Sequence, residues 1–260
     1  WRSRTPAAFD YIVKILTSKK EGVSSLRYLR SFDFVPDGDE KSEALLKIVS
    51  AGTAPMDVQS DALNRLGKTH LRDKPEVKKA LEAMLAGTRG KSGFIEVVKD
   101  FNIAGRDADV LDAALSDIKD ARALTGIKLM LKSDAGRHVL TDSLASPRAD
   151  KVVSLLGGSG DQQAIDLLLG TLFDVNNDKA VRVAAVKALA LSAAGAEAMV
   201  KLASTNRFPN EFKTEASAAL SLVQYPGISE RAATAFPTVA STSGKMAAIS
   251  ELVKLKGDKA

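Results

Sequence analysis

The chain has 260 residues, of which 45% are hydrophobic and 5% aromatic, and its 37 Lys and Arg against 32 Asp and Glu give a formal net charge of +5. It has no cysteine, which excludes disulfide bonds, thiolate metal sites and cysteine nucleophiles, and no apolar run approaches the roughly 20 residues of a membrane span. A core of Leu, Val, Ile and Ala with few aromatics favours packed helices over a β-sandwich. The small positive charge permits an anionic partner without requiring one.

Apolar residues recur along the chain at the helical spacing i, i+3, i+4 and i+7, and strand-like alternation is nearly absent. This pattern predicts helices around residues 9–16, 77–85, 94–101, 111–118, 165–173 and 181–191. Prolines stand where a helix is expected to begin, at Pro6, Pro55, Pro75 and Pro147. Glycines just past apolar runs predict helix ends at Gly67, Gly87, Gly157 and Gly195. The predicted helices are short, so each must pack on its neighbours.

Three segments of the chain are similar to one another: residues 57–66, 178–189 and 210–220. Residues 178–189 have an acidic start, a Val-Arg pair and Ala-rich packing positions, and they resemble the second helix of a HEAT repeat. The next copy follows about 30 residues later, within the range of repeat lengths in such families. The sequence therefore predicts an all-α fold, an α-solenoid (superhelix) of HEAT-like helical hairpin repeats with about five to seven helical pairs.

The predicted solenoid is a single domain over residues 1–256. A last helix is expected over residues 245–254, and residues 257–260 are expected to start a linker to a C-terminal domain that is missing from this fragment of a longer protein.

Two stretches resemble a narrower family. Residues 26–34 (Leu-Arg-Tyr-Leu-Arg-Ser-Phe-Asp-Phe) and residues 252–260 (Leu-Val-Lys-Leu-Lys-Gly-Asp-Lys-Ala) are similar to segments of large secreted proteins of planctomycetes and verrucomicrobia. Those proteins join a propeller-like dehydrogenase domain, a HEAT-like domain and a c-type cytochrome domain. The resemblance implies that this chain is a periplasmic or secreted connector between a dehydrogenase-like domain and a c-type cytochrome domain. Because the chain lacks the Cys-x-x-Cys-His motif of such cytochromes, it is not expected to hold haem or another cofactor itself.

Two clusters of charged residues are the candidate sites. A basic stretch is interrupted by acidic residues, which is typical of a solvated face, but it is also a candidate docking patch for a protein or, as a weaker alternative, for nucleic acid. Its members are Lys68, Arg72, Lys74, Lys78, Lys79 and Arg89. The second cluster is predicted to be a structural latch between the first repeats, in which Arg30 and Asp33 have the i, i+3 spacing of a helical ion pair and a buried Tyr28 needs a polar partner. Its members are Arg27, Tyr28, Arg30 and Asp33.

Other motifs favour structural interpretations. His70 and His138 are the only histidines, and neither has a second ligand at metal-binding spacing, although His138 and Asp142 could pair along a helix. Residues 157–160 (Gly-Gly-Ser-Gly) could hold a phosphate at a helix N-terminus. Because no strand precedes them and the P-loop lysine is absent, we interpret them as a turn between helices.

The leading hypothesis for function is a non-catalytic scaffold that joins domains or docks a protein partner, with no metal, cofactor or catalytic residue. The alternative is a nucleic-acid-binding protein similar to the HEAT-like alkylpurine DNA glycosylases, which the small charge excess and the few aromatics disfavour. A third idea, a HEAT-like chromophore lyase, has no specific residue in its favour.

Overall fold

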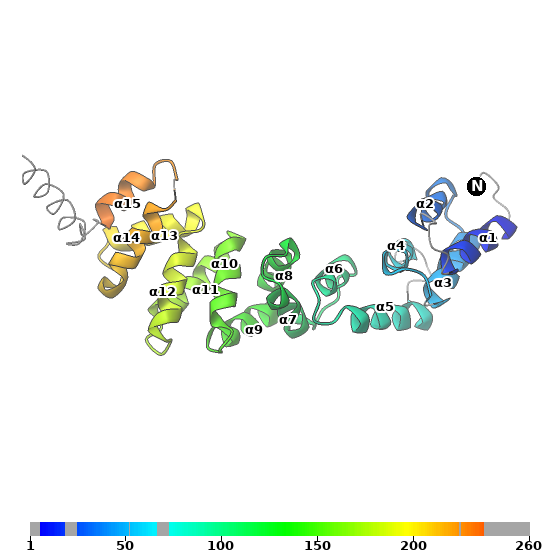
Figure 1. Ribbon diagram of the computed structural model, residues 1–260, viewed down its shortest axis with the longest axis horizontal. Helices are drawn as coiled ribbons and strands as arrows, with labels where there is room; N and C mark the ends of the chain where they lie inside the picture. Colours follow the sequence, from blue (N-terminus) through cyan, green and yellow to red (C-terminus); the bar gives the residue numbers. More distant parts are fainter. Residues whose placement is uncertain (1–5, 19–24, 52, 67–72, 224, 237–260) are drawn as a thin grey trace, which may run out of the picture. The chain divides into compact units, whose positions relative to one another are not determined.

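The computed structural model describes residues 6–18, 25–51, 53–66, 73–223 and 225–236. Across this part of the chain it holds fifteen α-helices, two short 3-10 helices and no strand, which confirms the all-α prediction (Figure 1). Contacts group the chain into two compact units, residues 1–123 and 124–260, so the expectation of one domain over residues 1–256 stays a prediction. The expected last helix and the linker lie outside the described residues.

Unit 1, residues 1–123, consists of short helices with narrow apolar stripes. They are α1 (Pro6–Thr17), α2 (Ser25–Leu29), the 3-10 helix η1 (Arg30–Phe34), α3 (Asp39–Ala51), α4 (Met56–Leu66), α5 (Pro75–Thr88), α6 (Gly93–Asp100) and α7 (Asp107–Ser116). As predicted, helices begin at Pro6 and Pro75, and α4 begins one residue after Pro55. Proline fits these places because the first N–H groups of a helix have no partner within it.

Unit 2, residues 124–260, continues from α8 (Ala121–Leu131), which begins just before the boundary. Its other helices are α9 (Asp134–Leu144), α10 (Ala149–Ser159), α11 (Gln162–Phe173), α12 (Lys179–Leu189), α13 (Ala193–Ser204), η2 (Asn210–Phe212), α14 (Lys213–Ser221) and α15 (Ser229–Ala235). Among the described residues no single helix is long and apolar enough to cross a membrane. Only α12 and α13 taken together, across a bend of 115°, pass the same test of length and composition.

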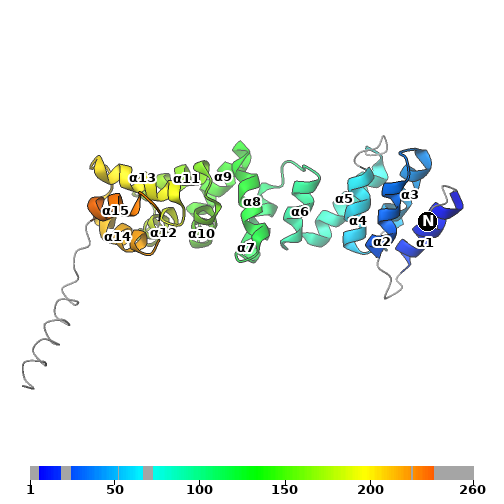
Figure 2. The ribbon, with the colours of Figure 1, turned by 90° about the horizontal axis from the view of Figure 1, so that it is seen from above.

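The helices of each unit contact their nearest neighbours in chain order. In unit 1, α1 packs on α3 and α3 on α5, while α2 packs on α4. In unit 2, α10, α12 and α14 form one row and α11, α13 and α15 form another, and Figure 2 shows α11 and α13 along one side with α10 and α12 along the other. Among the described helices, extensive contacts join only those one or two places apart. A helix of about a dozen residues is marginal alone in water, so these contacts hold it in place.

Small residues let the helices of a row approach closely. Ala62, Ala185 and Ala216 occupy corresponding places in the three similar segments, and each is 0% exposed. Gly157 of α10 faces Ala188 of α12: a Cβ atom added at Gly157 would lie 2.8 Å from the Cβ and the carbonyl oxygen of Ala188. The absence of a side chain at Gly157 therefore sets the distance between α10 and α12.

The glycine positions correct the predicted helix ends. Gly157 does not end a helix, because α10 runs through it to Ser159 and ends on Gly160, whose φ is +63°. Gly87 likewise lies inside α5, and Gly195 lies in the first turn of α13. Gly67 is outside the described residues. The prediction used the local rule that glycine follows a helix. Gly157 and Gly195 are instead glycines because a neighbouring backbone leaves no room for a Cβ atom.

Two corners between helices share one local design. Ser133 begins α9 and its hydroxyl accepts a hydrogen bond of 3.0 Å from the Gly136 amide. Ser192 begins α13 and accepts one of 3.1 Å from the Gly195 amide. In each corner a Cβ atom on the glycine would collide with the backbone carbonyl that ends the preceding helix, at Met130 or Leu189. The serine caps the N-terminus of the second helix, and the glycine allows the first turn of that helix to pack directly against the end of the preceding one.

The role of Gly157 predicts opposite effects for two glycine substitutions. Gly157→Ala is expected to lower the free energy of unfolding by about 1–3 kcal/mol, because the new methyl group has no room against α12. Gly170→Ala is the matched control, since Gly170 lies within α11 with no neighbour inside 4 Å. This second substitution should raise the free energy of unfolding by about 0.5–1 kcal/mol through helix propensity. Urea unfolding followed by circular dichroism measures both, and equal stabilities would contradict the close contact.

Candidate functional site

A groove lies on unit 2 between α13 and α15, with the start of α14 at one end. Its volume is about 630 Å³. One wall is the face of α13 that carries Glu197, Val200, Lys201 and Ser204, which recur at the helical spacing i, i+3, i+4 and i+7. The opposite wall comes from α15. Three of the charged lining residues are exposed, namely Lys201, Glu230 and Arg231, and Glu197 is half-buried. The groove is therefore a charged surface channel.

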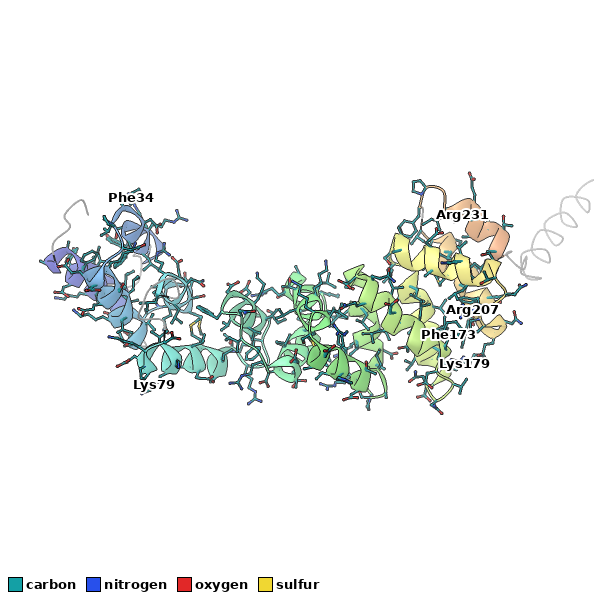
Figure 3. The ribbon with its side chains drawn as sticks, turned by 180° about the vertical axis from the view of Figure 1, so that it is seen from behind. Phe34, Lys79, Phe173, Lys179, Arg207 and Arg231 are labelled. Carbon is teal, nitrogen blue, oxygen red and sulfur yellow. The ribbon has the colours of Figure 1, made fainter. Side chains whose placement is uncertain are left out.

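A two-pronged ion pair closes one part of the groove. The Arg231 guanidinium donates to both carboxylate oxygens of Glu197, at 2.7 and 2.5 Å, and its Nε donates to the Gly227 carbonyl at 2.8 Å. Figure 3 shows Arg231 on α15. The hydrogen bonds from Arg231, helped by its charge and that of Lys201, lower the pKa of Glu197, and those bonds in turn raise the pKa of Arg231. The pair ties α13 to α15.

The other part of the groove is positive. Lys201 is exposed, Lys213 lies at the start of α14, and neither has an ion-pair partner within the described segments. The nearby turn is fixed by Asn206, whose φ is +54°, and by the Arg207 amide, which donates 2.8 Å to the Leu202 carbonyl. Asparagine tolerates this left-handed conformation better than most residues. The two lysine ammonium groups make this end a place for a carboxylate or another anion.

The predicted basic docking patch is only partly assembled. Lys74, Lys78 and Lys79 are exposed at the start of α5 (Lys79 is labelled in Figure 3). Arg89 instead pairs with Asp109 of α7, at 2.7 Å. Arg106 of the same unit binds both oxygens of Glu82 of α5, at 3.2 and 3.0 Å, so this acidic group of the helix is paired as well. Lys68 and Arg72 lie outside the described residues. The described part of the patch therefore contains three lysines beside neutralised pairs.

The predicted latch is formed differently from the expectation. Asp33 does not pair with Arg30: its carboxylate accepts from Arg65 of α4 at 3.0 Å, and Arg65 also pairs with Asp61. Tyr28, expected to be buried, is 39% exposed, and Arg27 and Arg30 are exposed as well. The ion pair between Asp33 and Arg65 joins η1 to α4 across 32 positions of sequence, so its cation could not be found from spacing along one helix.

The remaining predicted motifs lie on helices. His138 and Asp142 are both exposed on α9 and make no ion pair with each other in the described structure. The Gly-Gly-Ser-Gly segment at residues 157–160 is the last turn and the cap of α10; the turn interpretation holds only for Gly160. His70 lies outside the described residues. Among the residues that the structure covers, no group of three or more His, Asp or Glu side chains is placed to hold a metal ion.

A second charged cluster lies in unit 1 at the start of α8. The Asp120 carboxylate accepts from the Arg122 amide at 2.9 Å and from its guanidinium at 2.6 Å. These hydrogen bonds, with a further one from Ser92, hold the pKa of Asp120 well below its usual range. Arg122 also reaches Glu96 of α6 at 3.5 Å. The cluster caps α8 and joins it to α6.

Arg182 of α12 connects three elements of unit 2. Its Nε donates 2.9 Å to the Leu172 carbonyl at the end of α11, a guanidinium nitrogen lies 2.9 Å from a carboxylate oxygen of Glu211 in η2, and its side chain is only 12% exposed. The guanidinium carbon also lies 4.7 Å from the centroid of the Phe212 ring. The sequence signal for this residue was the Val-Arg pair of the HEAT-like segment, but its partners come from neighbouring helices.

Comparisons with protein-family models, with curated proteins and with solved structures find no match to this chain.

Removing the Arg182 contacts is expected to destabilise unit 2. Arg182→Met should lower the free energy of unfolding by about 1.5–3 kcal/mol, because it leaves the Leu172 carbonyl and the Glu211 carboxylate without their charged donor. Arg207→Met is the matched control: Arg207 is exposed, and its replacement should change the free energy by less than about 0.5 kcal/mol. Urea unfolding of the two variants makes the comparison, and similar small effects would show that Arg182 does not connect the three elements.

The Glu197–Arg231 pair predicts a pH-dependent contribution to stability. Because the folded-state pKa of Glu197 is below its ordinary value of 4.5, the contribution is complete above that value and is lost as the pH falls through the lowered folded-state pKa. The thermal midpoints of the wild type and Glu197→Gln should therefore differ at neutral pH and converge once the pH falls below the lowered folded-state pKa of Glu197. Glu230→Gln is the control: Glu230 lines the same groove but makes no ion pair with Arg231, so the difference between this variant and the wild type should not change with pH in this way. A gap that persists in acid would contradict the assignment.

Proposed function

We propose that this chain is a non-catalytic, protein-docking scaffold built as an α-solenoid of HEAT-like helical hairpins. The observation that supports the proposal most strongly is the contact pattern of α1 to α5 and of α10 to α15, in which helices pack on the next helix, on the next but one, or on both. Such a pattern is typical of repeat proteins, where each unit touches only its neighbours and the exposed faces form an extended binding surface. The corresponding buried alanines of the three similar segments agree with it.

The surface of the two units suits docking of a protein. The groove between α13 and α15 has a positive end formed by Lys201 and Lys213 beside a neutralised ion pair, a mixture that favours a partner with a few defined carboxylates. Nucleic acid is a weaker candidate, because the net charge is only +5 and Arg89 of the basic stretch and the nearby Arg106 are neutralised by acidic side chains.

The finer proposal concerns the place of the chain in a larger protein. The resemblance of residues 26–34 and 252–260 to secreted planctomycete and verrucomicrobial proteins favours a periplasmic connector between a dehydrogenase-like domain and a c-type cytochrome domain. Sequencing the coding region on both sides tests this point. The connector proposal requires a Cys-x-x-Cys-His motif downstream, and a coding region without one would remove the connector proposal while leaving the scaffold proposal intact.

A solenoid predicts that damage stays local. Gly157→Val should force α10 and α12 apart, and hydrogen exchange should then lose protection in these helices and their neighbours in unit 2. The helices α1 to α4 of unit 1 should keep their protection, because stability in a repeat stack is transmitted between adjacent units. Hydrogen–deuterium exchange of the full chain, compared with Gly170→Ala, measures the difference. Uniform loss of protection over both units would contradict the solenoid.

A further inference from the structure

The segment formed by α2 and η1 exposes an unusual set of side chains. Tyr28 is 39% exposed and Phe34 71% exposed, and Arg27 and Arg30 are exposed beside them. Arg27 and Arg30 are three positions apart where α2 passes into η1, a spacing that places them on one side of the segment. Figure 3 shows Phe34 at the outer edge of unit 1. Arginine and aromatic side chains are the residue types that dominate protein interfaces.

Buried side chains and an ion pair fix the same segment to α1 and α4. Leu29 and Phe32 are each 0% exposed, and the Phe32 ring stacks on Phe9 of α1 with 5.5 Å between ring centroids. The Asp33–Arg65 ion pair fixes the end of the segment to α4. Two buried apolar anchors and a charged tie to α4 therefore present the exposed side chains from a fixed platform, which lowers the entropy lost when a partner binds.

The two exposed arginines differ from the other arginines of unit 1. Within the described residues of that unit, Arg65, Arg89, Arg106 and Arg122 each pair with a carboxylate. Arg27 and Arg30 make no such pair in the same part of the chain, although acidic residues are plentiful there. The unpaired guanidinium groups thus coincide with the exposed aromatic rings, while the nearby carboxylates of Asp33 and Asp37 are already paired with Arg65 and Lys41.

We propose that this surface, which we name the α2–η1 surface and define by Arg27, Tyr28, Arg30 and Phe34, docks an acidic segment of a partner protein. Carboxylates of the segment pair with the two guanidinium groups, and an aliphatic side chain covers the Tyr28 ring. The inference rests on the proposed docking function and adds the place and the chemistry of the partner.

A protein segment fits this surface better than nucleic acid does. Only two cations are available, and Asp33, Asp37 and Glu40 follow within a few positions. A continuous phosphate backbone carries one negative charge per nucleotide, which two guanidinium groups cannot match along its length. A peptide can place a small number of carboxylates opposite the arginines and an apolar group between them, so the charge pattern selects an acidic peptide.

The test uses the full chain and a fluorescein-labelled synthetic peptide of about a dozen residues in which Glu alternates with Leu. Fluorescence anisotropy measures its binding to the wild type, to Arg27→Glu/Arg30→Glu and to the matched control Lys78→Glu/Lys79→Glu. The control makes the same charge change at two exposed lysines of α5 in the same unit. We expect about ten-fold or greater weakening for the arginine variant, little change for the lysine variant, and weakening for Tyr28→Ala as well. Circular dichroism confirms that each variant is folded.

Three outcomes would overturn the inference. The first is that the wild type does not bind the peptide. The second is that the two charge variants weaken binding equally, which indicates an effect of bulk charge alone. The third is that duplex DNA of similar length binds more tightly than the peptide and loses that binding in the arginine variant. The proposed scaffold function is judged separately by hydrogen exchange. A solenoid that passes that test but shows no peptide binding here would keep its architecture and lose only this docking surface.

Discussion

The close approach of short helices is the constraint on which the rest of this structure depends. Each helix carries one apolar stripe and is too short to be stable alone, so it must be covered by the helices beside it. The approach is set by residues without bulky side chains, such as Ala185 in α12, which is 0% exposed, and Gly157 in α10, which has no room for a Cβ atom. Once these contacts are fixed, the next helix has few directions in which to continue.

The presence of helices along the chain could be predicted from local signals, but their exact ends could not. Apolar spacing and the prolines at 6 and 75 indicated helices, and these are present. Gly157 and Gly195 were predicted to end helices because glycine often follows one. They lie inside helices instead, because each meets a neighbouring backbone that leaves no room for a side chain. A glycine kept for packing and a glycine kept for a positive φ are identical in sequence, and only the surrounding structure separates them.

The candidate site was less accessible to sequence reasoning for the same reason. The partner of Asp33 is Arg65, which lies 32 positions away and on another helix, whereas the spacing rule pointed to Arg30. The groove of unit 2 takes its walls from α13 and α15 and one end from α14. No single segment of the sequence therefore contains a pattern that predicts the groove. Arg182 was visible as a conspicuous residue of a repeat-like segment, but its acceptors, Leu172 and Glu211, belong to elements whose position depends on the packing.

Under the proposed docking function, the residues of the α2–η1 segment that bind a partner differ from those that stabilise the fold. Surface ion pairs contribute about 0–1 kcal/mol each, so leaving Arg27 and Arg30 without carboxylate partners costs the fold little. The same two groups would contribute far more to binding, because a docked partner excludes water and strengthens each charge-assisted hydrogen bond. The buried residues Leu29 and Phe32 on the other side of the segment carry the stability. Under the proposed docking function, substitutions at the exposed positions change the binding while the packing beneath them stays the same.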